Sequence, residues 1–252
     1  MDFEVSSEQL QIVNLAQRVA HECLAPRAEH YDNAGAHPRE SWHDLWENGF
    51  LAAAVPNEYG GLGLDMPTYS MVMEKLAGGC TSTAMTVHMH STVMRFINAL
   101  GTDQQKCRYF SEVVNQGKLF GSWGSEPESR GGSVHRQTTI APSGEGYVID
   151  GEKHFCTMAG GAHRYMIHCS LEGADPEQAL LLALAPHGTP GLNIIGDWNT
   201  LGMRATISPS VSFEDCYVEN QDVLGEAGQS QRLGVGLAFG LGYAAVYLGA
   251  AQ

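Results

Sequence analysis

A segment rich in glycine and serine, followed by an aromatic ring and a hydroxyl, is the part of the sequence best suited to chemistry. The chain reads Gly-Ser-Trp-Gly-Ser-Glu-Pro from Gly121, has Gly-Gly-Ser at 131–133, and reaches Phe-Cys-Thr at 155–157. Small residues let backbone N–H groups approach a bulky planar or anionic ligand. In an extended strand Phe155 and Thr157 share one face, because side chains alternate along a strand. A flat ring, a hydroxyl and main-chain donors together predict a flavin site.

The histidines and cysteines do not form a metal-binding pattern. His88 and His90 lie two residues apart on a predicted helix and therefore face different ways. The six cysteines are scattered and include no C-x-x-C pair, which favours neither a zinc site nor a disulfide framework. We therefore expect no metal site, and free cysteines are typical of a reducing compartment.

The overall composition narrows the function class. The chain has 252 residues and a formal net charge of -14, with only 14 lysines and arginines spread along it. Binding to nucleic acid requires clustered basic residues, so we expect no nucleic-acid partner. The sequence shows neither a signal peptide at its start nor an apolar run long enough to span a bilayer. These features predict a cytoplasmic protein with no membrane association.

Three regions with different patterns must position the flavin segment. Residues 1–118 show helical periodicity: Ser6 and Gln9 form a capping-box pattern, and Pro26 is expected to end the first helix. Residues 119–226 contain short β-rich pieces separated by Gly, Pro and Asp turns. They predict a compact antiparallel β-barrel, and hence an α+β fold.

Residues 227–252 form the third region and return to a helical pattern, with a helix expected from Leu233 to Gln252. This helix is rich in glycine, which costs about 1 kcal/mol per residue relative to alanine in a helix. Such a helix needs close packing against partner helices, and we expect those partners to lie outside this chain. The region is therefore predicted to be the first helix of a helical bundle, in a truncated or partial sequence.

Several motifs, in the same order, resemble those of the acyl-CoA dehydrogenase superfamily. Val55-Pro-Asn-Glu-Tyr-Gly-Gly-Leu-Gly63 is similar to a loop of that family, and Ser125-Glu-Pro with 131–133 resembles its flavin loop. The further resemblances lie at 147–157, at Leu201-Gly-Met-Arg204 and at 213–218. The resemblance covers essentially the whole chain and implies a helical N-terminal domain, a middle β-barrel and a C-terminal four-helix bundle, with FAD, or alternatively FMN, between barrel and bundle.

The resemblance also implies roles for individual residues. Thr157 would bond flavin N5, and Phe155 stands where the family has a stacking tryptophan. Arg130 is expected near a ligand phosphate, and His90 near the substrate, as flavin monooxygenases of this fold use histidines near the flavin. Glu126 is expected to be a structural loop residue. The complete set predicted to bind the cofactor is Ser122, Trp123, Gly124, Ser125, Gly131, Gly132, Ser133, Phe155, Cys156 and Thr157.

Three functions remain open at this level. The first is an acyl-CoA dehydrogenase, which needs a carboxylate to take the α-proton while hydride goes to flavin. No such base is recognisable here, and Phe239 stands about where some relatives carry it. The second is a two-component flavin monooxygenase that uses reduced flavin and O2, and the third is a non-catalytic partner subunit. The implied partners are an acyl-CoA or another small substrate, an electron-transfer flavoprotein or flavin reductase, and further copies in a homodimer or homotetramer.

Overall fold

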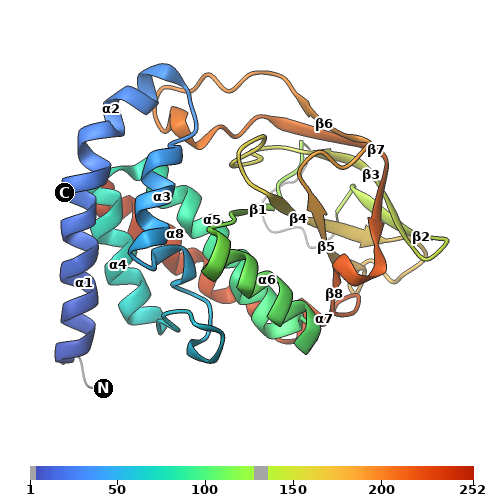
Figure 1. The fold of residues 1–252 in the computed structure, drawn as a ribbon. Helices are drawn as coiled ribbons and strands as arrows, with labels where there is room; N and C mark the ends of the chain where they lie inside the picture. The colour runs from blue at the N-terminus through green and yellow to red at the C-terminus, as the bar shows by residue number, and fades with distance from the viewer. Residues whose placement is uncertain (1–3, 128–135) are drawn as a thin grey trace.

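Helices and a sheet form two adjoining parts of the molecule (Figure 1). The computed structural model describes residues 4–127 and 136–252. Strand β1 leads directly from the helical part into the sheet, and the chain later returns to the helices through its last segment. The helices of the first part are α1 (Ser7–Val19), α2 (Ala25–Ala34), α3 (Arg39–Glu47), α4 (Met66–Gly79), α5 (Thr81–Leu100) and α6 (Asp103–Gln116).

The first helix begins as predicted but does not end at Pro26. The Ser6 side chain accepts from the backbone of Gln9, and the Gln9 side chain accepts from the backbone of Ser6. A π-helical turn, Ala20–Leu24, then joins α1 to α2. Pro26 occupies the first turn of α2. Proline is tolerated there, because first-turn N–H groups have no intrahelical acceptor.

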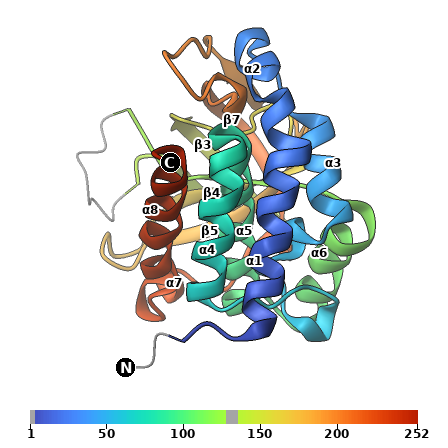
Figure 2. The same cartoon turned by 90° about the vertical axis from the view of Figure 1, so that its left-hand side faces the viewer.

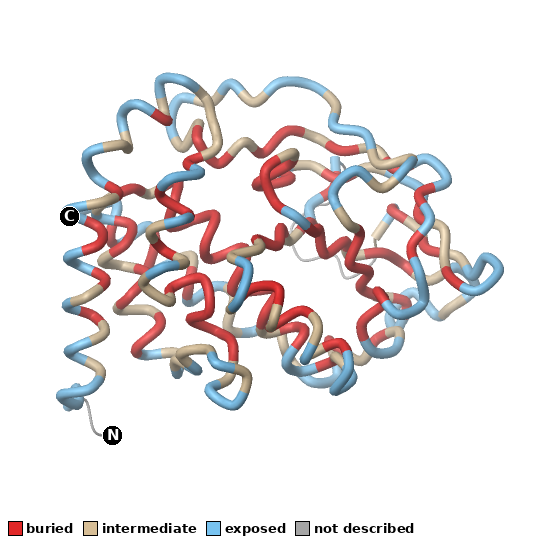
Figure 3. The backbone as a smooth tube through the Cα atoms, viewed as in Figure 1, coloured by how far each residue is buried: buried red, intermediate tan, exposed pale blue. Residues whose placement is uncertain are grey.

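Helix α5 is the centre of the helical part. Sixteen of its twenty residues are buried, whereas α1 alternates between buried and exposed positions (Figure 3). Several of its buried polar side chains are hydrogen-bonded, which offsets the cost of burying them. Thr86, for example, donates to its own helix at Thr83 O and accepts from the indole of Trp42 at 2.9 Å.

The sheet is open, so the predicted closed antiparallel barrel is wrong. Its order is β6-β7-β3-β2-β4-β5-β8, with β1 beside β4, and no pairing joins β6 to β8 among the strands described. These end strands are short, with four and two residues, and a closed barrel needs continuous pairing around its circumference. Strands β1 and β2 both run parallel to β4. The strands are β1 (Phe120–Trp123), β2 (Thr139–Ser143), β3 (Gly146–Lys153), β4 (Arg164–Leu171), β5 (Leu180–Pro186), β6 (Leu192–Ile195), β7 (Ser210–Glu219) and β8 (Val223–Leu224).

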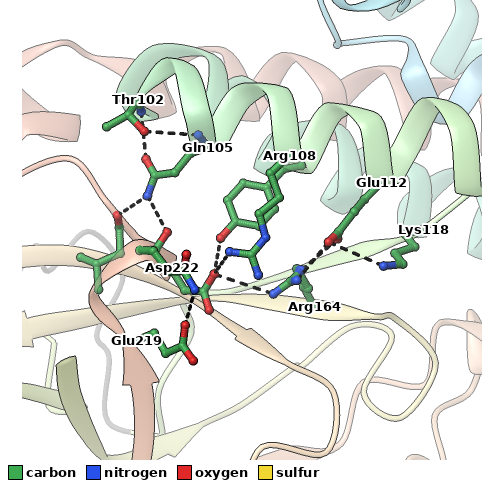
Figure 4. A network of polar contacts seen from close by, with 11 residues as sticks. Thr102, Gln105, Arg108, Glu112, Lys118, Arg164, Glu219 and Asp222 are labelled. Carbon is green, nitrogen blue, oxygen red and sulfur yellow. Dashed lines mark hydrogen bonds and ion pairs between the residues drawn. The ribbon is translucent and has the colours of Figure 1, made fainter. Parts of the chain in front are cut away.

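A network of polar contacts fixes α6 against the sheet (Figure 4). Gln105 donates to the backbone oxygens of Gln221 and Val223, at 2.9 and 2.7 Å. One turn further along, Arg108 donates to Asp222 at 3.0 Å. Because two of these bonds end on the buried residues Val223 and Asp222, they set the position of the sheet relative to the helices.

The last segment is not the single helix from Leu233 that the sequence predicts. It consists of α7 (Gln229–Arg232), a 3-10 turn at Val235–Ala238 and α8 (Phe239–Ala250). Gly234, at φ 63°, interrupts the helix, since this left-handed conformation suits glycine. Of the helices described, none is both long and apolar enough to cross a membrane.

Helix α8 packs against α4 and α5, beside which it lies in Figure 2. A Cβ added at Gly249 would lie 2.0 Å from the carbonyl oxygen of Glu74, and one at Gly242 would lie 2.1 Å from the ring of His88. The glycines therefore allow close approach to helices of this same chain, so the expectation that the partner helices lie elsewhere is wrong for this face. Other α8 side chains, among them Leu241, Tyr247 and Leu248, are exposed.

Candidate functional site

A cavity of about 1090 Å3 lies between α5, the sheet and the C-terminal segment. Helix α5 contributes Met85 and Phe96, and Tyr243 of α8 lies on the wall as well. The end of β1, the loop after β3 and the segment before β7 supply the polar part of the wall. The cavity is thus mainly apolar with polar groups concentrated at the sheet side, as in small-molecule sites.

Three hydroxyls meet on the wall of this cavity. Ser208 Oγ lies 3.0 Å from Thr157 Oγ1 and 3.0 Å from Thr206 Oγ1. Thr206 donates its proton to the carbonyl of Met203 at 2.9 Å. Two backbone bonds flank the group, Cys156 N to Pro209 O and Met158 N to Thr206 O, both 3.0 Å. The two chain segments are therefore fixed relative to each other at the hydroxyls.

Phe155 reaches the cavity without being part of a strand. Strand β3 ends at Lys153, and Phe155 has a positive φ of 54°. The predicted extended strand with alternating side chains is therefore wrong. Phe155 and Thr157 nevertheless both line the cavity. The Phe155 ring, 65% exposed, meets the ring of Trp198 edge to face at 6.1 Å.

The predicted cofactor segment divides between the cavity and the core. Ser122, Gly124 and Ser125 line the cavity. Trp123 lies in the core, where it stacks on Tyr165 at 3.9 Å and donates to the Thr157 carbonyl at 3.0 Å. Trp123 thus supports the backbone of Thr157.

Cys156, predicted to bind the cofactor, and His90, predicted near the substrate, are also placed off the cavity. Cys156 is fully buried and is not part of the lining, and burial raises the pKa of its thiol. His90 is fully buried too: its Nε2 donates to Leu51 O at 2.9 Å, and its Nδ1 accepts from Phe120 N at 3.0 Å. Burial lowers the pKa of His90 to about 4, so the ring is neutral and joins α5 to β1. The predictions for Arg130, Gly131, Gly132 and Ser133 lie outside the described residues.

Glu126 has contacts consistent with the structural role predicted for it. Its carboxylate accepts from the backbone of Gln137 at 2.8 Å and of Thr138 at 3.0 Å. It also forms an ion pair with Lys153, whose side chain is completely buried. Burial alone would raise the pKa of Glu126, but the bond and charge of Lys153 and the two backbone donors outweigh it and lower the pKa. The pair holds the end of the glycine- and serine-rich segment against β3.

Sequence reasoning missed most of the apolar wall. Met85, Met89 and Phe96 on α5 have the spacing of ordinary core residues, so nothing local distinguishes them. His168 is half-buried and lines the cavity as well. Burial, with the nearby positive charges of Arg136 and Lys153, lowers the pKa of His168 to about 3.

The donor set suits an organic ligand. Over the residues that the structure describes, no group of three or more His, Cys, Asp or Glu is arranged to hold a metal ion. The cavity instead offers hydroxyls and aromatic rings. A Cβ at Gly124 would lie 3.5 Å from the His168 ring, which is an ordinary van der Waals contact.

Two family models match the chain. Residues 6–116 match the acyl-CoA dehydrogenase N-terminal domain, and residues 121–216 match the acyl-CoA dehydrogenase middle domain. Together they cover most of the 252 residues. The two matches follow each other along the chain without overlap.

Individual proteins show the same relationship. A probable acyl-CoA dehydrogenase of Bacillus subtilis is 29% identical over 233 residues, which are 90% of this chain and 60% of that protein. A dibenzothiophene monooxygenase of Rhodococcus erythropolis is 31% identical over 214 residues, 84% of this chain and 51% of that protein. The structure of butyryl-CoA dehydrogenase from Megasphaera elsdenii superposes with a TM-score of 0.90 at 25% identity, over 99% of this chain and 67% of that one. The chain thus spans between about half and two thirds of the length of these proteins.

Proposed function

Because the chain belongs to the acyl-CoA dehydrogenase family, we propose that its cavity holds a flavin, FAD in the first place, and that the protein is a flavin-dependent oxidoreductase. The observation that supports this is the cavity itself. A wall of hydroxyls from Thr157, Thr206 and Ser208 lies in the same cavity as the aromatic side chains Phe155 and Trp198. A flavin ring has this combination of needs, since its faces are apolar and its edge carries nitrogens and carbonyls.

The residues present fit the flavin. Phe155 and Trp198 would cover the ring, and Thr157 would face its polar edge. Ser122 and Ser125 add hydroxyls at the end of β1. When bound, the flavin supplies an acceptor for a hydride, which no side chain of the protein can replace.

We propose acyl-CoA dehydrogenation as the reaction: a carboxylate takes the α-proton of an acyl thioester, and hydride leaves from the β-carbon. Similarity to the Bacillus subtilis protein and to butyryl-CoA dehydrogenase supports this assignment. None of the described residues that line the cavity is Asp or Glu, so no base is assigned to this chain. The contribution proposed for the described residues is to bind and orient the flavin.

A flavin monooxygenase on the same scaffold is the second candidate. The dibenzothiophene monooxygenase of Rhodococcus erythropolis is slightly more identical to this chain than the Bacillus subtilis protein, at 31% against 29%. Phe155 in the position of the family's stacking tryptophan favours the same alternative. A monooxygenase would draw reduced flavin from a reductase, whereas a dehydrogenase would pass electrons to an electron-transfer flavoprotein.

Association with other subunits belongs to the same proposal. The exposed side chains Leu241 and Leu248, which are not part of the cavity lining, give α8 an apolar outer face. Large exposed apolar patches mark contact surfaces in soluble proteins. This face supports the proposal of a homodimer or homotetramer.

Flavin binding followed by reduction with substrate tests these assignments. The purified chain is titrated with FAD and with FMN, each in the oxidised and reduced state, and tryptophan fluorescence is followed. The flavin-loaded protein is then mixed with a panel of acyl-CoA thioesters without another reductant. Loss of the yellow colour of the flavin supports the dehydrogenase. Preference for reduced flavin, no bleaching by any thioester and oxygen consumption support the monooxygenase, and failure to bind any flavin would overturn the proposal.

A further inference from the structure

We propose that Thr157, Ser208 and Thr206 form a hydroxyl relay that reverses its direction, so that Thr157 can either donate a hydrogen bond to the ligand or accept one from it. The inference rests on the proposed assignment of the cavity to a flavin. It adds roles for Ser208 and Thr206, which contribute through Thr157. Both are positioning residues in this arrangement.

The contacts fix which hydroxyls can change direction. Thr206 has one proton and donates it to the Met203 carbonyl at 2.9 Å, so toward Ser208 it can only accept. Ser208 Oγ lies 3.0 Å from both threonine oxygens and also has one proton. A hydroxyl donates once and accepts up to twice. Ser208 must therefore choose between Thr157 and Thr206.

The choice made by Ser208 sets what Thr157 presents to the cavity. When Ser208 donates to Thr157, the Thr157 proton is free to point at a ligand, and Thr157 is a donor. When Ser208 donates to Thr206, a lone pair of Ser208 accepts the Thr157 proton. Thr157 then presents only lone pairs and is an acceptor. No heavy atom moves between the two arrangements, because only hydroxyl rotation is needed.

The surrounding backbone keeps the three oxygens in place. Thr157, Thr206 and Ser208 are 8%, 3% and 4% exposed. Ile207, directly after Thr206, has a φ of 40°, and Met203, three residues before Thr206, has a φ of 56°. These left-handed conformations cost energy, for a β-branched residue above all, and persist only where the surroundings enforce them. The strain thus lies directly beside the hydroxyls, as is common at functional sites.

The reversal matches a change that a flavin undergoes on reduction. In oxidised flavin the nitrogens at the edge of the central ring can only accept hydrogen bonds. Reduction places a hydrogen on one of them, which then donates. Thr157 as a donor therefore suits oxidised flavin, and Thr157 as an acceptor suits reduced flavin. Because Ser208 and Thr206 make both arrangements available, the site can hold both redox forms without an unsatisfied hydroxyl.

Ser208→Ala and Thr206→Val test the relay through binding and potential. Without the Ser208 oxygen, the Thr157 proton loses the acceptor it needs in the acceptor arrangement. Without the Thr206 oxygen, Ser208 is held in donation to Thr157. In both variants we expect the affinity for reduced flavin to fall about tenfold relative to that for oxidised flavin. For a two-electron couple this lowers the midpoint potential of the bound flavin by about 30 mV.

Conservative variants and a matched control make the result decisive. Ser208→Thr and Thr206→Ser keep the hydroxyls and should restore the wild-type ratio of affinities. Ser41→Ala, which removes a buried hydroxyl of α3 that is not part of the cavity lining, should leave the ratio unchanged. If Ser208→Ala and Thr206→Val weaken the binding of oxidised and reduced flavin equally and leave the midpoint potential unshifted, the two residues have a merely structural role. That result would overturn the relay. If the wild-type chain binds neither form, the flavin assignment itself fails, and the relay with it.

Discussion

Arg164 and Glu112 face each other across the junction of the sheet and α6, joined by two parallel hydrogen bonds (Figure 4). Arg164 Nε lies 2.9 Å from one carboxylate oxygen and Nη2 lies 3.0 Å from the other. Both residues are buried. Burial alone would raise the pKa of Glu112, but the bonds and charge of Arg164 outweigh it and lower the pKa. The pair holds the start of β4, and with it β1, against the helices.

Glu112→Gln is expected to destabilise the protein by about 3 kcal/mol, because it leaves the guanidinium of Arg164 buried without its carboxylate. Urea denaturation at neutral pH measures this change. Lys118→Met is the matched control: Lys118 contacts the same carboxylate at 3.6 Å but is more exposed, so its loss should cost less than about 1 kcal/mol. Equal effects of the two substitutions would contradict the importance of the paired geometry.

Stability should fall in mildly acidic solution, and His90 should account for part of the fall. Burial lowers the pKa of His90 to about 4, against about 6.5 when unfolded. Its contribution is fully present above the unfolded pKa and is lost as pH falls from about 6.5 to about 4, by about 1.4 kcal/mol per pH unit. Urea denaturation at a series of pH values measures the slope. His90→Gln keeps a donor and an acceptor but cannot titrate, so the slope of the free energy of unfolding against pH should fall by the equivalent of about one proton. An unchanged slope would contradict the neutral, buried state assigned to His90.

Gly249→Ala and Gly240→Ala should change stability in opposite directions, although both lie in α8. A Cβ at Gly249 would lie 2.0 Å from the backbone oxygen of Glu74, so α8 must shift away from α4. We expect Gly249→Ala to lower the free energy of unfolding by about 1 to 3 kcal/mol. Gly240 has no atom within 4 Å of an added Cβ, and alanine there should gain up to about 1 kcal/mol in helix propensity. Thermal and urea denaturation of the two variants test this, and a neutral Gly249→Ala would show that α8 does not pack as described.

Phe155→Ala should weaken flavin binding about tenfold, because the exposed ring loses its contact with the ligand while little folding energy depends on it. Trp198, edge to face with Phe155, provides the signal: flavin should quench its fluorescence, and Trp198→Phe should remove most of the change. Leu201→Ala is the control, since Leu201 is fully exposed and does not line the cavity. Equal affinities of Phe155→Ala and wild type would remove Phe155 from the flavin site.

Local patterns predicted much of the architecture. The capping box of Ser6, the helical region and the change to strands near Leu119 all follow from short-range periodicity, and the structure has them. The effect of Pro26 could not be predicted from short-range periodicity, because a π-helical turn before it allows the chain to start a new helix there. Barrel closure depends on whether the end strands meet, and turn signals carry no information about that. The division at 118 and 226, the cytoplasmic location and the individual flavin contacts stay predictions.

The sequence by itself determined the order of helices, strands and final helix, and the family. It also predicted the segment from Gly121 to Thr157 as the place for a cofactor. Only the tertiary structure brought Ser208 to Thr157 across 51 positions, and Met89 of α5 and Tyr243 of α8 to the same cavity. The reason is physical: helix caps and alternation act between neighbours in the chain, whereas a cavity wall is made by packing between distant segments. The hydroxyls became a connected group because backbone bonds on both sides of Thr157 fix it against the segment before β7.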